Sequence, residues 1–118
     1  MSFRIQRAQA LIKEEISIIV HHGLKDPRIK NITITEVKLS PDLRNAVVYF
    51  SVLGNEEDIN SAKEGLDRAH GFIRKEIGHK IQMKFTPELR FVYDDTAQKA
   101  AHISELLEEA KKNAKPNN

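Results

Sequence analysis

The sequence predicts one α+β domain in which amphipathic helices cover one face of a small three-stranded sheet. Two stretches repeat apolar residues at helical spacing, one near the N-terminus and one after residue 55. Between and after them, three stretches alternate with the period of a strand. At 118 residues the chain is long enough for a single buried core. We expect residues 1–112 to form this domain and residues 113–118 to be a disordered tail.

The first helix is predicted from five apolar residues that share one helical face: Ile5, Ala8, Ile12, Ile16 and Ile19. Gly23 is a typical C-terminal stop for such a helix. The next segment, LKDPRIK, contains an Asp-Pro pair and predicts a turn, because proline keeps the preceding residue out of the helical region. Asp26 fits a bracing role in this turn better than a ligand-binding role.

A β-hairpin is predicted from NITITEVKLS and AVVYFSVL, which are separated by the turn signal SPDLRN. In the first strand the apolar phase changes between Ile34 and Val37, so we expect a bulge near Thr35 and Glu36. The second strand keeps its apolar side chains on one side without a slip.

A long second helix is predicted after Asn55, which can cap it. Its apolar stripe consists of Ile59, Ala62, Leu66, Ala69, Ile73 and Ile77. TPELRFVYDD predicts the third strand, and Asp95 with Gln98 is typical of a capping box for a last helix. The sequence leaves open whether this last helix packs on the domain.

Two glycines, Gly71 and Gly78, lie in the second helix beside Arg74 and Lys75, opposite the apolar stripe. A glycine inside a helix costs roughly 1 kcal/mol relative to alanine. A glycine that serves close packing should face the core, as Gly65 does. Gly71 therefore permits either a kink, with a new helix start near Phe72, or close approach by another molecule's backbone.

The charge distribution favours an anionic partner more than the net charge of +2 does. Between residues 68 and 90, six arginines and lysines face only two acids, which gives +4. A solvated basic face without a partner is the plain alternative.

Several functional classes are excluded or disfavoured. The chain has no cysteine and no apolar run long enough to span a membrane. The adjacent His21 and His22 diverge on a helix, and Asp94 with Asp95 suits a helix cap better than an acid–base pair. We expect no enzyme activity, no metal and no cofactor, and we expect a cytoplasmic protein.

Four motifs in order resemble the bacterial ribosome-binding factor A family: LKDPRI, ITITEVKLSPDLRNAVVYFS, AHGFIRKEIG and TPELRFVYD. The resemblance covers essentially the whole chain and implies a KH-like fold of type II topology. It also implies a helix kink at Ala69, His70 and Gly71, in place of the Gly-x-x-Gly loop of ordinary KH domains.

The resemblance further implies a monomeric factor that binds free small (30S) ribosomal subunits, assists their late maturation and supports processing of the 16S rRNA near its 5′ end. It implies that the protein aids growth in the cold and that assembly GTPases help to release it. By position and charge, the RNA-binding residues implied are Gly71, Arg74, Lys75, Arg28, Lys30, Lys80, Lys84, Arg4, Arg7 and Arg90.

Two other functions stay open from the residues. A stand-alone KH-like module for single-stranded RNA would need exposed aromatic platforms, whereas Phe91 and Tyr93 are predicted to face inward and Phe72 to lie at the edge of the buried face. A protein-binding adaptor would use the last helix, with its acidic Glu105, Glu108 and Glu109.

Overall fold

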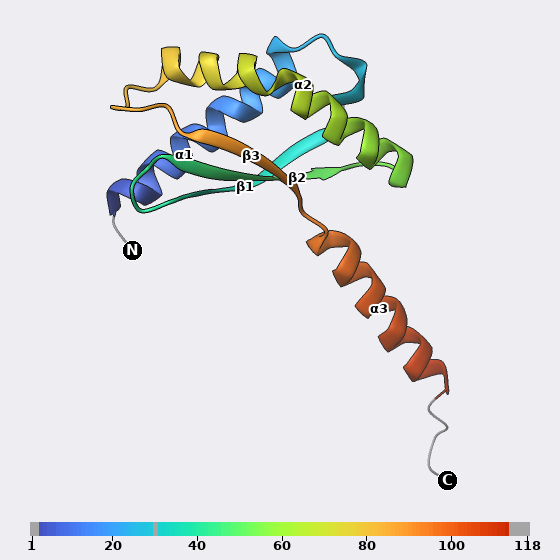
Figure 1. Cartoon of the computed structure of the whole chain (residues 1–118). Helices are drawn as coiled ribbons and strands as arrows, with labels where there is room; N and C mark the ends of the chain where they lie inside the picture. The colour runs from blue at the N-terminus through green and yellow to red at the C-terminus, as the bar shows by residue number, and fades with distance from the viewer. Residues whose placement is uncertain (1–2, 30, 114–118) are drawn as a thin grey trace.

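A computed structural model describes residues 3–29 and 31–113. Figure 1 shows their arrangement. In chain order the regular elements are α1 (Phe3–Ile18), β1 (Ile32–Leu39), β2 (Asn45–Val52), α2 (Glu56–Lys80), β3 (Glu88–Tyr93) and α3 (Thr96–Asn113). This order confirms the predicted α+β class and matches the KH-like topology. Of the predicted tail, residues 114–118 lie outside the described part, and Asn113 ends α3.

The N-terminal helix runs further than α1 alone, because a π-helical turn, Ile19–Gly23, continues it to the predicted stop. Ile12 and Ile16 on its inner face are fully buried. The ring atom Nε2 of His21 lies 3.0 Å from the carbonyl oxygen of Ile32, which ties this turn to the start of β1. The Asp-Pro segment then forms a single 3-10 turn, Pro27–Ile29.

The sheet has the strand order β1-β2-β3. β1 and β2 pair antiparallel, and β2 and β3 pair parallel. The register of the first pair shifts between Ile34 and Glu36, so the predicted bulge is confirmed. Because of this shift, Ile34 and Val37 are both buried although they lie three residues apart.

α2 begins as predicted, with Asn55 as its cap. The Asn55 side chain accepts a hydrogen bond from the Asp58 amide, and the Asp58 carboxylate accepts one from the Asn55 amide, at 3.0 and 2.8 Å. The predicted stripe faces the core: Ile59, Ala62, Leu66, Ile73 and Ile77 are buried, and Ala69 packs against them.

One core lies between the sheet and two helices, α1 and α2, which cover the same face of the sheet (Figure 1). Phe50 on the central strand is fully buried there. Phe91 and Tyr93 are partly buried against this core, as predicted, and Tyr93 meets Phe50 edge to face with centroids 5.9 Å apart. The third helix takes no part in the core.

α3 extends away from the sheet on the side opposite to α1 and α2 (Figure 1). All its described side chains, residues 96–112, are exposed, including the apolar Ile103, Leu106 and Leu107. The carboxylate at its start differs from the predicted one. Asp94, and not Asp95, accepts hydrogen bonds from the amide and hydroxyl of Thr96, which lower the pKa of Asp94.

Candidate nucleic-acid interface

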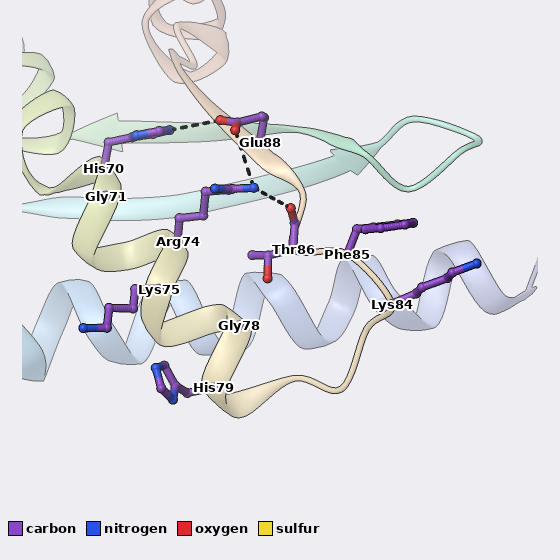
Figure 2. A pocket seen from close by; sticks show the side chains of 10 residues that line it. All are labelled: His70, Gly71, Arg74, Lys75, Gly78, His79, Lys84, Phe85, Thr86 and Glu88. Carbon is purple, nitrogen blue, oxygen red and sulfur yellow. Dashed lines mark hydrogen bonds and ion pairs between the residues drawn. The ribbon is translucent and has the colours of Figure 1, made fainter.

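A groove of about 660 Å³ runs between the C-terminal half of α2 and the segment that connects α2 to β3 (Figure 2). It brings together four of the predicted RNA-binding residues, which are Gly71, Arg74, Lys75 and Lys84. Its other lining residues are His70, Gly78, His79, Phe85, Thr86 and Glu88. We call this the α2 groove.

Gly71 opens directly onto this groove, and a Cβ atom added there would meet no atom within 4 Å apart from the adjacent part of its own helix. α2 is continuous from Glu56 to Lys80, so the predicted new helix start near Phe72 is wrong. The helix axis changes direction part-way along its length without a break (Figure 1). Because the backbone at Gly71 is uncovered, it meets the condition for close approach by another molecule.

Arg74 is only half exposed, because its guanidinium is engaged within the protein. Nη2 donates to the carbonyl oxygen of Thr86 at 2.9 Å, and Nε donates to that of Pro87 at 3.2 Å. Nη2 also lies 3.5 Å from a carboxylate oxygen of Glu88. These contacts hold the α2–β3 connection against the helix (Figure 2). Arg74 therefore has a structural role that its helical position did not predict.

Lys75, the next residue, is the free cation of the pair. Its side chain is exposed and points away from Arg74 in Figure 2. Within residues 3–29 and 31–113, it makes no hydrogen bond or ion pair. An unpaired ammonium beside an uncovered backbone suits a phosphate contact.

Gly78 corrects a second expectation, since it does serve close packing. A Cβ atom there would lie 2.8 Å from Oγ1 of Thr86, on the α2–β3 connection. Gly65 packs as predicted, because its added Cβ would lie 2.7 Å from Cγ2 of the buried Ile29. A glycine on the side opposite the apolar stripe can thus still have a close neighbour, a side chain of a loop that the helical pattern does not show.

His70 joins α2 to β3. Its Nε2 lies 3.0 Å from the carbonyl oxygen of Leu89 and 4.0 Å from a carboxylate oxygen of Glu88. Since a carbonyl oxygen only accepts, Nε2 carries the proton in this bond. The ring packs edge to face on Phe91. These contacts give His70 a bracing role between α2 and β3.

A second groove, of about 500 Å³, adjoins the first and shares Lys84 and Phe85 with it. It lies among the start of α1, the β1–β2 turn and the α2–β3 connection. Arg4 and Arg7 from the predicted set line it, together with Arg44. We call this the Phe85 groove.

Three other predicted residues lie apart from both grooves. Arg28 is held at the other end of α2 by the carboxylate of Asp26, which also accepts from the Arg28 amide. These hydrogen bonds lower the pKa of Asp26 to about 2 and raise the pKa of Arg28, which confirms a bracing role for Asp26. Arg90 is exposed on the edge strand β3, and Lys80 is exposed at the end of α2. Lys30 lies outside the described residues.

The residues that the sequence pattern missed are those of the α2–β3 connection. Phe85 lies between Lys84 and Thr86 and is half exposed. An aromatic residue in the short polar segment KFTPE was the available signal. Among the described residues, the structure contains no cluster of side chains suited to a metal ion and no helix long and apolar enough to cross a membrane.

Comparison with known proteins then decides the family. The model of the family described as ribosome-binding factor A matches residues 4–107. The chain belongs to the ribosome-binding factor A family. A family member from Acetivibrio thermocellus is 49% identical over 107 residues, which are 90% of this chain and 87% of that protein.

Solved structures of the family agree with the fold. The crystal structure of ribosome-binding factor A from Thermus thermophilus superimposes with a TM-score of 0.68 at 26% identity, over 75% of this chain and 93% of that one. A Thermus thermophilus ribosome-binding factor A model fitted into a cryo-electron microscopy map of a 30S complex gives 0.63 at 26% identity, over 75% and 92%. The resemblance in the four sequence motifs is thereby confirmed at the level of the family.

Proposed function

We propose that this protein binds the small ribosomal subunit through the α2 groove and acts in the maturation of that subunit. The carrying observation is the uncovered backbone at Gly71 with the unpaired Lys75 beside it. Family membership supports the proposal, and so does the 30S complex into which the related Thermus factor was fitted.

The chemistry of the α2 groove suits a phosphate backbone rather than base edges. Lys75 and Lys84 supply charge without a fixed direction, and Gly71 lets a strand come close to the helix. Glu88 is the acid of the groove, and its pairing with Arg74 offsets its charge. RNA shape would then decide the docking position, because phosphate contacts carry no sequence information.

The proposal extends to the finer role that the family resemblance implies. The protein would bind free 30S subunits as a monomer in the cytoplasm, where bacterial ribosomes are assembled. It would assist late maturation and 16S rRNA processing near the 5′ end, with assembly GTPases promoting its release. Action would be by binding alone, without a catalytic step. Support for this last point comes from the family, which is described as a ribosome-binding factor.

The test is co-sedimentation with purified small subunits, large subunits and joined ribosomes over a salt series. Lys75→Glu is the test variant, and Lys63→Glu is its control, with the same charge change on an exposed lysine of the same helix. Arg74 is avoided because its replacement would also release the α2–β3 connection. Circular dichroism checks that both variants are folded.

We expect salt-sensitive binding to free small subunits, weakened roughly tenfold by Lys75→Glu, with a salt slope smaller by about 1. Lys63→Glu should bind like the wild type. Equal binding by Lys75→Glu and Lys63→Glu would remove the α2 groove from the interface. Binding to no ribosomal particle would contradict the proposed function as a whole.

A further inference from the structure

The Phe85 groove differs in character from the α2 groove, because large apolar side chains and several cations line it together. Leu11 and Phe85 are about half exposed there, which is unusual for large apolar side chains in a concave site. Arg7, Arg44 and Lys84 supply positive charge around them. A site with an apolar surface and several cations suits a ligand that is both flat and anionic.

Phe85 and Arg44, which both line this groove, form a cation–π pair. The guanidinium carbon of Arg44 lies 4.8 Å from the centroid of the Phe85 ring, and Nζ of Lys84 lies 5.5 Å from it. Aromatic rings and arginine planes are the two surfaces on which proteins stack unpaired bases. The pair therefore offers a stacking surface with a phosphate-binding lysine beside it.

The backbone on both sides of the pair is fixed. The Arg44 amide donates to the Asp42 carboxylate at 3.1 Å, and its carbonyl oxygen accepts from the Glu88 amide at 2.8 Å. Leu43 has a φ of +64°, a value that costs free energy for a bulky residue and that the tight turn imposes. On the other side, Arg74 holds the carbonyl oxygen of Thr86, the residue after Phe85.

We propose that the Phe85 groove binds one unpaired nucleotide of the RNA that lies in the α2 groove, with its base stacked on the Phe85–Arg44 pair. This inference rests on the proposed function, because the two grooves share Lys84 and Phe85 and would follow one strand. Fixed stacking surfaces bind with little loss of conformational entropy.

The charges of the groove orient the nucleotide. Asp42 is the acid that lines it, and hydrogen bonds from Ser40 and from the Arg44 amide lower the pKa of this carboxylate. Its negative charge disfavours a phosphate near the β1–β2 turn. The phosphates therefore belong on the side of Lys84 and Arg7. An acidic peptide is the competing occupant, and it has no need of an aromatic surface.

The test uses the full-length protein and three probes, which are a single-stranded RNA pentauridylate, an abasic ribose-phosphate pentamer and a hexaglutamate peptide. Binding is followed by NMR chemical shifts of the protein amides in titrations up to millimolar probe. The variants are Phe85→Ala, Phe85→Tyr and Phe72→Ala. Phe72 is the matched control because its exposed fraction, 46%, is close to the 50% of Phe85 and it lines neither groove.

We expect the pentauridylate to shift the amides of Leu11, Leu43 and Arg44 and to bind about tenfold more tightly than the abasic pentamer. Phe85→Ala should abolish that preference, whereas Phe85→Tyr and Phe72→Ala should keep it. Equal binding of the two pentamers, no shifts in this groove, or tighter binding of hexaglutamate would overturn the inference. None of these results would contradict the proposed function, which is tested separately by the binding of Lys75→Glu to small subunits.

Discussion

The middle of α2 differs from its two flanks in what lies against its glycines. Gly65 packs against the Pro27–Ile29 turn, and Gly78 packs against Thr86, whereas Gly71 between them faces open space. All three are helical, so none is present for an unusual backbone conformation. Two of them let a connecting segment lie close to the helix within the protein. The third leaves the same kind of space empty, which is where we place the RNA backbone.

This difference shows that a helical pattern gives the face on which a residue lies, but not what packs against that face. Gly71 and Gly78 are seven residues apart, so they share one face of the helix. The pattern therefore gives them the same environment. The α2–β3 connection returns across only the C-terminal part of that face, and it alone separates a packed glycine from an open one.

The largest effect is expected for Gly65→Ala. The added methyl group would lie 2.7 Å from Cγ2 of Ile29 and 3.2 Å from Cβ of Arg28, so the 3-10 turn has to move. Overpacking of this kind costs about 2 kcal/mol, more than the helix propensity that alanine adds. Urea unfolding followed by circular dichroism measures the loss. An unchanged or higher stability would mean that the turn yields freely and that Gly65 is not a packing glycine.

Smaller changes in stability are expected for alanine at the other two glycines, and the two changes should have opposite signs. Gly71→Ala should stabilise the protein by about 0.5 kcal/mol, since alanine restricts the unfolded chain and meets nothing in the folded one. Gly78→Ala should destabilise it by about 1 kcal/mol through contact with Thr86.

The same unfolding assay compares these two variants, and Thr86→Ala supplies the control. Because that change removes Oγ1, the loss caused by Gly78→Ala should shrink in the double variant. A loss of stability in Gly71→Ala would contradict the open environment and would favour a bend that requires glycine.

The smallest effect is expected in the pH dependence of stability at acid pH. Arg28 lowers the pKa of Asp26 from 3.8 to about 2 in the folded protein. Since the folded state binds this proton more weakly than the unfolded state, the ion pair stabilises the protein above the ordinary pKa. That contribution is lost as the pH falls from 3.8 towards 2.

Unfolding measured across this pH range should therefore show a weaker pH dependence in Asp26→Asn than in the wild type. Asp67→Asn, at an exposed carboxylate of α2, is the control and should keep the wild-type dependence. Parallel curves for all three proteins would show that the turn under Gly65 does not depend on this charge.

Local features of the fold were predictable from the sequence. The Asn55 cap, the stripe from Ile59 to Ile77 and the bulge after Ile34 each follow from neighbouring residues, and each is confirmed. The position of α3 was not predictable. An apolar stripe shows that a helix could pack against the core, but it does not show that the helix does so. The choice of Asp94 over Asp95 as the first acceptor of α3 also depends on where β3 ends.

The candidate site was predictable in its charge and not in its contacts. Lys75 and Lys84, two of the predicted RNA-binding residues, both line the α2 groove. Their exposure follows from the local pattern, since surface cations need no partner from elsewhere in the chain. Arg74 was misjudged because its acceptors, the carbonyl oxygens of Thr86 and Pro87, lie more than ten residues away. Phe85 contacts Arg44 of the β1–β2 turn, and no local pattern contains this contact between residues 41 positions apart.

The exposed state of α3 has a consequence for how the protein opens. A helix of 18 residues without packing is marginal in water. α3 should therefore open and close by itself, and its amide hydrogens should exchange with solvent far faster than those of α2. The cooperative unfolding transition then describes the body of the protein up to β3. The C-terminal helix folds and unfolds independently of that transition.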